Sequence, residues 1–307
     1  MKLKNKIVCV TGGAGFLGSN LCRKLVEVNN KVIIIDNFSL GSMDNLKGIE
    51  NDVEIITADI RFPETIKDAI KRSEIIYHFA AISNLNICRK QIELAYDINV
   101  NGTANVLSLC SDAERVFFSS SITIYGNTNN IPVDEESKLD PLDPYSFTKV
   151  AGEYIVKMYS SQYNIPFVIT RNCNIFGPYQ KIDFLIPTLI TQGLKDKEIQ
   201  IWDPRPVRDY LFVDDAVPAF IRMVESEAAK NEVFNLGSGS CFSSGELAEI
   251  ISNLLGVRWV DIKKPQPVSP KLATETKKIN ALTGWKSEYN IMTGLENTIE
   301  YFKREVQ

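Results

Sequence analysis

The chain has 307 residues, of which 44% are hydrophobic and 23% charged, and its formal net charge is −4 at pH 7. The length favours about two domains, and the composition is that of a globular protein and excludes a disordered chain. The slight excess of acidic residues excludes the strongly basic surface of a nucleic-acid-binding protein. Any His-based metal site, hydrolytic triad or general base would have to use the only histidine, His78.

Short β-branched segments alternate with longer amphipathic segments through the first 240 residues. The predicted strands are almost continuously apolar, which is typical of a parallel sheet covered on both faces. They are residues 7–10, 31–35, 53–57, 75–79, 116–119 and 167–170. Helices are predicted over residues 17–28, 89–110 and 145–163. This alternation predicts right-handed crossovers, and therefore an α/β, doubly wound parallel-sheet fold.

The chain changes in character after Arg171, where shorter elements are separated by proline-containing loops. No flexible linker joins the two parts. We therefore predict a larger N-terminal domain over residues 1–171, completed by interleaved segments near 205–237. A smaller C-terminal α/β lobe is predicted over most of residues 172–307.

A glycine-rich segment directly follows the first predicted strand and opens the first helix. Gly12, Gly15 and Gly18 form the pattern G-x-x-G-x-x-G. Glycine at these positions permits a tight turn and a close approach of the backbone to a pyrophosphate, which the helix N-terminus stabilises. The second strand ends at Asp36, whose carboxylate can accept hydrogen bonds from ribose hydroxyls and would repel a 2′-phosphate. The segment predicts a dinucleotide site that prefers NAD to NADP.

A second acid, Asp59, ends the third predicted strand. It would be placed to meet the amino group of an adenine base. The alternative interpretation is a polar residue that simply terminates the strand.

Tyr145 and Lys149 form a Y-x-x-x-K pair at the start of a predicted helix. The i, i+4 spacing puts both side chains on one face of the helix. An ammonium group and a cationic nicotinamide ring stabilise a phenolate, so we expect the tyrosine pKa to fall below its usual value of about 10. The pair could then transfer protons without a histidine. Three serines, residues 119–121, end a buried strand where active sites of open α/β sheets lie.

The remaining residue counts bear on the cellular environment. The six cysteines are scattered and form no CxxC pair, which indicates reduced thiols and a cytoplasmic protein. No apolar stretch approaches the roughly 20 residues of a membrane span, so we expect no membrane partner. His78 lies inside a predicted buried strand, which favours a packed core histidine over a catalytic one. We expect no metal.

Taken together, the motifs resemble the extended short-chain dehydrogenase/reductase family, and within it the NAD-dependent nucleotide-sugar epimerase/dehydratase branch typified by UDP-glucose 4-epimerases. The resemblance covers roughly residues 5–285 and implies a Rossmann fold with NAD as cofactor. It rests on TGGAGFLGS at 11–19, DN at 36–37, ADI at 58–60, HFAA at 78–81, NVNGT at 99–103, SSSITIYG at 119–126, PYSFTK at 144–149, RNCNIFGP at 171–178, RDYLFVDD at 208–215 and FNLGSG at 234–239.

The resemblance implies a role at each matching position. Tyr145 would be the acid–base that acts on a sugar hydroxyl, Lys149 would hold the nicotinamide ribose, and Ser121 would bind the sugar oxygen. Asn174 and Arg208 would meet the diphosphate of a nucleotide sugar. The residues expected to bind the cofactor are Gly12, Gly15, Phe16, Leu17, Gly18, Asp36, Asn37, Asp59, Ile60, Phe79, Ala80, Ala81, Asn99, Ser119, Tyr145 and Lys149.

The resemblance also implies the partners of the chain. The substrate would be a nucleotide sugar. A second copy of the chain would pack through the helices near 89–110 and 145–163, because members of the family commonly form homodimers there.

The reaction implied by the resemblance starts with oxidation of the sugar C4 to a ketone. A 4,6-dehydratase of this family typically carries an Asp-Glu pair just after the active-site serine, and a uronic-acid decarboxylase carries a glutamate at the second position. This chain has Ile122 and Thr123 there. A 4-epimerase needs no second acid, so 4-epimerisation of a UDP-hexose is the leading hypothesis. The alternatives are a C4 dehydrogenase of UDP- or GDP-sugars, a 4,6-dehydratase and a non-catalytic NAD sensor.

Two segments depart from the family pattern at the end that would bind the nucleotide sugar. An arginine expected before the last helices is absent from residues 263–271, which contain lysines and prolines instead. Residues 204–206, Pro-Arg-Pro, stand where the family more often has a glycine-containing turn. These departures leave the nucleotide base open.

Overall fold

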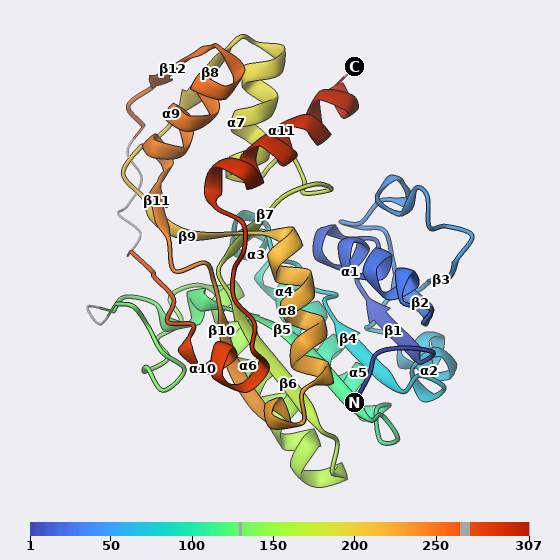
Figure 1. The fold of residues 1–307 in the computed structure, drawn as a ribbon. Helices are drawn as coiled ribbons and strands as arrows, with labels where there is room; N and C mark the ends of the chain where they lie inside the picture. The colour runs from blue at the N-terminus through green and yellow to red at the C-terminus, as the bar shows by residue number, and fades with distance from the viewer. Residues whose placement is uncertain (129–130, 265–270, 307) are drawn as a thin grey trace.

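The computed structural model describes residues 1–128, 131–264 and 271–306 of the chain. Its centre is a seven-stranded parallel sheet in the order β10-β6-β5-β4-β1-β2-β3 (Figure 1). The chain runs outward from β1 in both directions, which confirms the predicted doubly wound α/β fold. The strands are β1 (Ile7–Thr11), β2 (Lys31–Asp36), β3 (Val53–Thr57), β4 (Ile75–His78), β5 (Arg115–Ser121), β6 (Phe167–Asn172) and β10 (Glu232–Leu236).

Helices cover both faces of the sheet (Figure 1). On one face, α1 (Phe16–Glu27) packs beside α8 (Val213–Glu225), and α10 (Lys277–Thr283) lies next to β10. On the other face, α2 (Pro63–Lys71), α5 (Gly102–Ser108) and α6 (Pro144–Tyr163) lie in sequence. Short 3-10 turns are η1 (Met43–Leu46), η3 (Ile122–Tyr125) and η4 (Glu227–Ala229).

Local sequence sets both ends of α6. Its first turn has Pro144 at a position that needs no N–H donor, and the Asp143 carboxylate accepts the backbone N–H of Ser146 at 3.0 Å. The helix ends at Asn164, which takes a left-handed conformation with φ of 55°. The capped start places Tyr145 and Lys149 on the first two turns.

The helix predicted over residues 89–110 is wrong as a single element. The structure has α3 (Leu85–Lys90), α4 (Ile92–Tyr96), a π-helical turn η2 (Asp97–Asn101) and then α5. Gln91 breaks the first two pieces, with φ of −132° and ψ of 63°. The apolar pattern continues across this break, so periodicity alone did not reveal it. The list of predicted strands also lacked β10.

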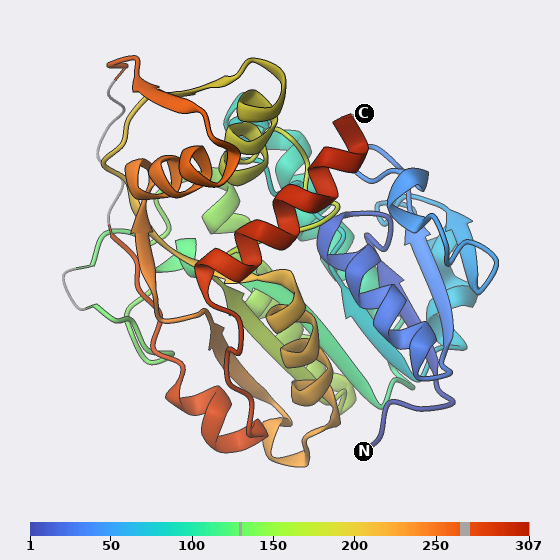
Figure 2. The ribbon, with the colours of Figure 1, turned by 45° about the horizontal axis from the view of Figure 1, so that its top comes forward.

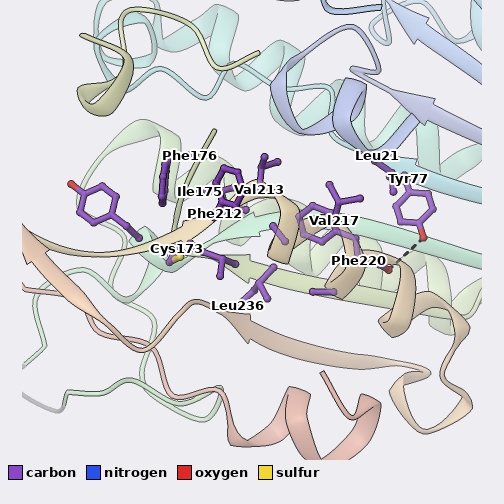
Figure 3. Close-up of a cluster of buried hydrophobic side chains, with 14 of the residues drawn as sticks. Leu21, Tyr77, Cys173, Ile175, Phe176, Phe212, Val213, Val217, Phe220 and Leu236 are labelled. Atoms are coloured by element: carbon purple, nitrogen blue, oxygen red, sulfur yellow. Dashed lines mark hydrogen bonds between the residues drawn. The ribbon is translucent and has the colours of Figure 1, made fainter. Parts of the chain in front are cut away.

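The core has two halves, one on each face of the sheet, because successive residues of a strand point to opposite faces. Val8 and Val10 belong to the half under α1 and α8, whereas Cys9 belongs to the half under α5 and α6. Figure 3 shows that the first half continues from Leu21 and Phe220 to the aromatic pair Phe176 and Phe212. The sheet and the second lobe therefore share one hydrophobic core.

The second lobe lies beyond the carboxyl ends of the sheet strands (Figure 2). In the described part of the chain, a three-stranded sheet, a two-stranded sheet and the helices α7, α9 and α11 build it. The last helix, α11 (Ile291–Val306), packs on α7, α9 and β9. The other elements are β7 (Asn174–Phe176), α7 (Leu185–Lys195), β8 (Glu198–Ile201), β9 (Val207–Phe212), β11 (Cys241–Ser243), α9 (Ser244–Leu255) and β12 (Arg258–Asp261).

Candidate active site

A cavity of about 470 Å³ lies at the carboxyl ends of the parallel strands. It follows the point between β1 and β4 where the strand order reverses, and ligands of open α/β sheets bind at such points. Its walls come from the sheet on one side and from residues 180–186 of the second lobe on the other. The cavity therefore joins the two parts of the molecule.

The glycine-rich turn forms one end of the cavity. Gly12 has φ of 71°, and a Cβ there would stand 2.7 Å from the backbone nitrogen of Ala80. A Cβ on Gly18 would collide with the carbonyl oxygen of Gly12 and stand 2.7 Å from the Cα of Gly13. Among the residues that the structure describes, no side chain caps the N-terminus of α1, so its first N–H groups are available to a bound phosphate. The turn thus needs glycine for packing reasons and presents donors for an anion.

Asp36 closes the end of β2 and lines the same cavity. Its two carboxylate oxygens accept the backbone N–H groups of Ala14 at 2.9 Å and Phe38 at 2.8 Å. Burial raises the pKa of Asp36, and these two hydrogen bonds oppose that rise. The carboxylate is held in place by backbone and keeps lone pairs that can accept ribose hydroxyls.

Asp59 also lines the cavity, but a neighbouring arginine holds it. Its carboxylate accepts from Arg61 Nη2 at 2.8 Å and from Asn37 Nδ2 at 2.8 Å. The hydrogen bond from Arg61 lowers the pKa of Asp59 to about 2. Asp59 is therefore an ionised strand terminus that is already paired on the protein side.

Ser121, Tyr145 and Lys149 converge on the middle of the cavity. The Ser121 hydroxyl lies close enough to that of Tyr145 to lower the pKa of Tyr145. Lys149 is 5% exposed, and its Nζ donates to the carbonyl oxygen of Ser119 at 2.7 Å. This nitrogen lies 5.8 Å from the centre of the Tyr145 ring. The sequence motif thus becomes a cluster of three functional side chains.

The two pKa values in this cluster correct one expectation. Burial raises the pKa of Tyr145 above its usual value, and the Ser121 hydroxyl offsets only part of the rise. Burial also lowers the pKa of Lys149 to about 8. The expected lowering of the tyrosine pKa by Lys149 is therefore not met by the side chains alone. The cost of burying a phenolate is the larger effect, and the ammonium group is directed at a backbone carbonyl.

Asn99 lies behind the cavity and is 3% exposed. Its amide accepts the backbone N–H of Ile82 at 2.8 Å and donates to Thr148 Oγ1 at 3.0 Å. Of the residues predicted to bind the cofactor, Asn99 alone is missing from the lining of the cavity as the described residues define it. It connects the loop after β4 to the helix that carries Tyr145.

The substrate end agrees less closely with the sequence prediction. Asn174 and Tyr210 both line the cavity, and they are paired in the register of β7 and β9. Arg208 lies on the same strand, β9, but outside the lining, and its Nη1 donates to the carbonyl oxygen of Val207 at 2.8 Å. The lysine- and proline-containing segment noted at 263–271 falls mainly on residues 265–270, which lie outside the described residues.

Several residues that line the substrate end were not predicted from the sequence. Gln180, Lys181 and Asp183 come from the loop before α7, and Asn84 donates to Asp183 at 2.8 Å across the cavity. Three of these polar residues follow the Gly-Pro turn at 177–178 within six positions. A polar cluster directly after a turn was the available signal.

Three structural features of the cavity fit a bound dinucleotide. A Cβ at Gly12 or Gly18 would fill the cradle, an uncapped helix N-terminus faces it, and a fixed carboxylate lies one strand away. Within residues 1–128, 131–264 and 271–306, no group of His, Cys, Asp and Glu side chains has the arrangement of a metal site. None of the helices in this part of the chain is both long and apolar enough to cross a membrane.

Comparison with known proteins places these features in a wider context. The model of the NAD dependent epimerase/dehydratase family matches residues 8–237. A putative UDP-glucose 4-epimerase of Methanocaldococcus jannaschii is 34% identical over 97% of this chain and 98% of its own length. Human dTDP-D-glucose 4,6-dehydratase is 30% identical over 97% of this chain and 90% of its own length. The crystal structure of Thermotoga maritima UDP-glucose 4-epimerase with UDP-glucose superposes with a TM-score of 0.93, at 27% identity, covering 98% of this chain and 100% of that chain.

Proposed function

The chain belongs to the NAD-dependent epimerase/dehydratase family, and from this premise we propose that it is a nucleotide-sugar 4-epimerase. Its cofactor is NAD, as the sequence predicted. The proposed substrate is a UDP-hexose, which passes through a transient 4-keto sugar. Similarity to UDP-glucose 4-epimerases supports this substrate class.

The observation that carries the proposal is the chemistry of the turn after Ser121. Ile122 is 2% exposed and belongs to the hydrophobic core, so it does not reach the substrate. Thr123 lines the cavity, and its hydroxyl donates to Ser121 Oγ at 3.1 Å. Neither residue can remove or supply a proton at neutral pH, whereas elimination of water needs a second acid–base there. Epimerisation needs only the Tyr145 cluster.

The remaining carboxylates of the cavity support the same choice. In the described part of the chain, the acidic residues that line it are Asp36, Asp59 and Asp183. The first two are held at the nucleotide end by backbone N–H groups and by Arg61, and Asp183 accepts a hydrogen bond from Asn84. A carboxylate already paired in this way is a poor substitute for an acid–base aimed at the sugar.

Each side chain of the cluster has a defined task in the proposed reaction. Tyr145 accepts the proton of the sugar 4-hydroxyl and later returns it, and Ser121 shares the hydrogen bond to the same oxygen. Lys149 holds the nicotinamide ribose, for which its Nζ keeps donors beyond the one given to Ser119. When bound, NAD supplies hydride transfer at C4 and a ring charge that favours the ionised tyrosine. Burial of Tyr145 makes the phenolate a strong base once it forms.

We propose the same binding roles for the other predicted residues. The glycine turn and α1 hold the pyrophosphate, Asp36 holds the ribose, and Asn174 meets the sugar-nucleotide diphosphate. We also propose that Arg208 meets the diphosphate, although its Nη1 donates to the carbonyl oxygen of Val207. The division into a NAD-binding domain, 1–171 with segments near 205–237, and a sugar-nucleotide lobe over most of 172–307 follows from these roles.

A homodimer through the helices near 89–110, which include α4, and through α6 at 145–163 is part of the proposal. These helices expose large apolar side chains, including Tyr154 at 65%, Met158 at 55% and Phe147 at 50%. Phe147 already contacts Tyr96 across the two helices, with ring centres 5.7 Å apart. Such a patch is typical of an interface. A cytoplasmic location is likewise proposed, because all six cysteines are unpaired and five are buried.

A sugar-nucleotide panel tests the proposed reaction. Purified enzyme with NAD is incubated with UDP-, dTDP- and GDP-hexoses, and the products are identified by NMR. Interconversion of C4 epimers is the expected result. A product that has lost water would assign a dehydratase, and accumulation of a 4-keto sugar with reduced cofactor would assign a dehydrogenase. No change across the panel would contradict an enzyme and leave the NAD sensor.

A further inference from the structure

His78 occupies a central position that the proposed reaction does not use. It is the last residue of β4 and pairs with Thr11 of β1 at the point where the strand order reverses. Its side chain is 1% exposed. Nδ1 lies 2.6 Å from Thr11 Oγ1, and Nε2 lies 2.9 Å from Thr103 Oγ1. Both ring nitrogens therefore have hydroxyl partners, one on β1 and one on α5.

The hydroxyl of Thr103 decides which ring nitrogen carries the proton. Thr103 Oγ1 lies 2.7 Å from the carbonyl oxygen of Asn99 and must donate its single proton there, because a carbonyl only accepts. It can then only accept from His78, so Nε2 is the protonated nitrogen. In a neutral ring Nδ1 is then unprotonated and accepts the hydroxyl proton of Thr11. For a neutral histidine, the geometry therefore fixes the Nε2–H tautomer.

The hydrogen bonds continue beyond Asn99 to the helix of the catalytic tyrosine. The Asn99 amide donates to Thr148 Oγ1 at 3.0 Å, and Thr148 Oγ1 donates to the carbonyl oxygen of Tyr145 at 2.7 Å. Thr103 donates to the backbone carbonyl of Asn99, whereas the Asn99 side-chain amide donates to Thr148, so two runs of hydrogen bonds meet at this one residue. Asn99 lies in the π-helical turn η2, and turns of this kind are common at functional sites.

We infer that His78 is a positioning residue, which fixes the glycine-rich turn of the cofactor site relative to the backbone of Tyr145 through the chain Thr11–His78–Thr103–Asn99–Thr148. The inference deepens the proposed function, since it rests on the proposed role of Tyr145. A buried histidine in the core needs no such connection to both ends of the site. Removing the hydrogen bonds between His78 and Asn99 should therefore disturb the position of the cofactor relative to Tyr145, while the fold persists.

The surroundings of His78 keep it neutral. Burial lowers the pKa of His78 to about 3, and the charge of Lys149 acts in the same direction. The Phe118 ring lies 5.7 Å away and offers no counter-charge. An imidazolium would have to donate from Nδ1 as well, and Thr11 would then lose its acceptor.

The single histidine makes the tautomer directly measurable. Protein with NAD is labelled with ¹⁵N-histidine, and the two ring nitrogens are observed by two-bond ¹H–¹⁵N correlation between pH 5.5 and 8.5. The expected spectrum is that of one neutral Nε2–H tautomer that does not change with pH. An Nδ1–H tautomer, a mixture, or a titration near pH 6.5 would overturn the inference. The result does not depend on any sugar reaction.

Thr103→Val tests whether the connection positions the site. It keeps the shape of the side chain and removes the hydroxyl between His78 and Asn99. The matched control is Thr298→Val in α11, because Thr298 is also fully buried and also donates to a carbonyl four residues earlier, that of Gly294 at 2.6 Å. Thr103→Ser restores the hydroxyl.

We expect Thr103→Val to weaken NAD binding, measured by calorimetry without sugar, about fivefold, and to allow a second histidine tautomer. In the epimerase assay, kcat should fall by a similar factor with the sugar KM unchanged. Thr298→Val should lower the free energy of unfolding by an amount similar to that of Thr103→Val, but it should leave NAD affinity, the histidine tautomer and kcat unchanged. Thr103→Ser should restore all three to their wild-type values. Unchanged NAD affinity and tautomer in Thr103→Val, at equal stability loss, would refute positioning even if the sugar reaction proves to be a different one.

Discussion

The two ends of the cavity are built in different ways. At the nucleotide end, the groups that would meet a ligand are backbone atoms and one carboxylate held by backbone, within residues 11–18 and at Asp36. At the substrate end, side chains from distant segments hold one another. Asn84 donates to Asp183, which is 99 residues away, at 2.8 Å. Next to Tyr210 of the lining, Asp209 of β9 accepts from Ser238 Oγ at 2.8 Å and from Thr274 Oγ1.

This difference separates the binding of a pyrophosphate, which many ligands share, from the selection of a particular sugar. Backbone donors and glycines recognise a pyrophosphate whatever the rest of the ligand is. Side chains such as Asn174, Gln180 and Lys181 can change without disturbing the sheet, because they stand on loops and short strands. We therefore expect cofactor binding and sugar selection to respond to separate substitutions.

The largest effect on activity should come from Tyr145, which lies in the middle of the cavity, between its nucleotide and substrate ends. Tyr145→Phe removes the proton acceptor, so kcat for the epimerisation should fall by roughly 10²–10⁴-fold. NAD affinity should stay within about twofold, because the backbone turn that binds NAD is untouched. Steady-state kinetics and calorimetry measure the two quantities. Tyr289→Phe is the control, since Tyr289 lies outside the cavity lining. Near-normal turnover in Tyr145→Phe would remove this residue from the mechanism.

Two alanine substitutions in the glycine turn sharpen the comparison at the nucleotide end. Gly18→Ala puts a methyl group against the backbone of Gly12 and Gly13, and should lower the free energy of unfolding by about 3 kcal/mol and abolish NAD binding. At Gly15, a Cβ meets only the Gly12 carbonyl oxygen, at 3.1 Å. Gly15→Ala should therefore cost less than about 1 kcal/mol of stability. Urea unfolding and NAD titration compare the two, and equal stability losses would contradict this account of the turn.

The buried side chain of His78 should make the stability of the protein depend on pH. The unfolded chain protonates His78 below about pH 6.5, whereas the native state keeps it neutral down to a pKa of about 3. The unfolded state thus binds more protons, and the free energy of unfolding falls as the pH drops. From pH 6.5 to 5 this contributes a loss of about 2 kcal/mol.

Comparison with His78→Gln isolates this contribution from those of the carboxyl groups. Urea unfolding of both proteins at pH 7, 6 and 5 should show a steeper loss in the wild type. Parallel pH dependence of the two would show that His78 titrates alike in the native and the unfolded state, which contradicts this expectation.

A smaller effect is expected for a substitution next to the substrate end. Asp209 is fully buried and also accepts the backbone N–H groups of Ser238 at 3.0 Å and Gly239 at 3.2 Å. Asp209→Asn keeps the shape but weakens these charge-assisted bonds. The sugar-nucleotide KM should rise about tenfold with unchanged NAD affinity. A parallel loss of NAD affinity would show that the two ends are not independent.

The parts of the fold that could be predicted are those whose signals are local. The glycine turn, the acid at the end of β2 and six of the seven central strands each lie within a few consecutive residues. The break at Gln91 could not be predicted, because the apolar pattern runs through it into the π-helical turn. The strand β10 went unrecognised because it joins β6 from 60 residues further along the chain.

The site follows the same rule. Tyr145, Lys149 and Ser121 were identified from motifs, and the structure brings them together in one cavity. Gln180 and Asp183 were missed because only the fold places that loop opposite the sheet. The pKa of Tyr145 was expected to fall, but burial, which depends on tertiary structure, raises it.

The most direct test of the central claim follows the hydrogen at the sugar C4. UDP-glucose deuterated at C4 is incubated with the enzyme and NAD in ordinary water, and the products are analysed by NMR and mass spectrometry. We expect a mixture of the two C4 epimers, each with its deuterium still at C4, because the same hydride returns to the opposite face. Deuterium at C6 of a dehydrated product, or its permanent transfer to the cofactor with release of a 4-keto sugar, would contradict it.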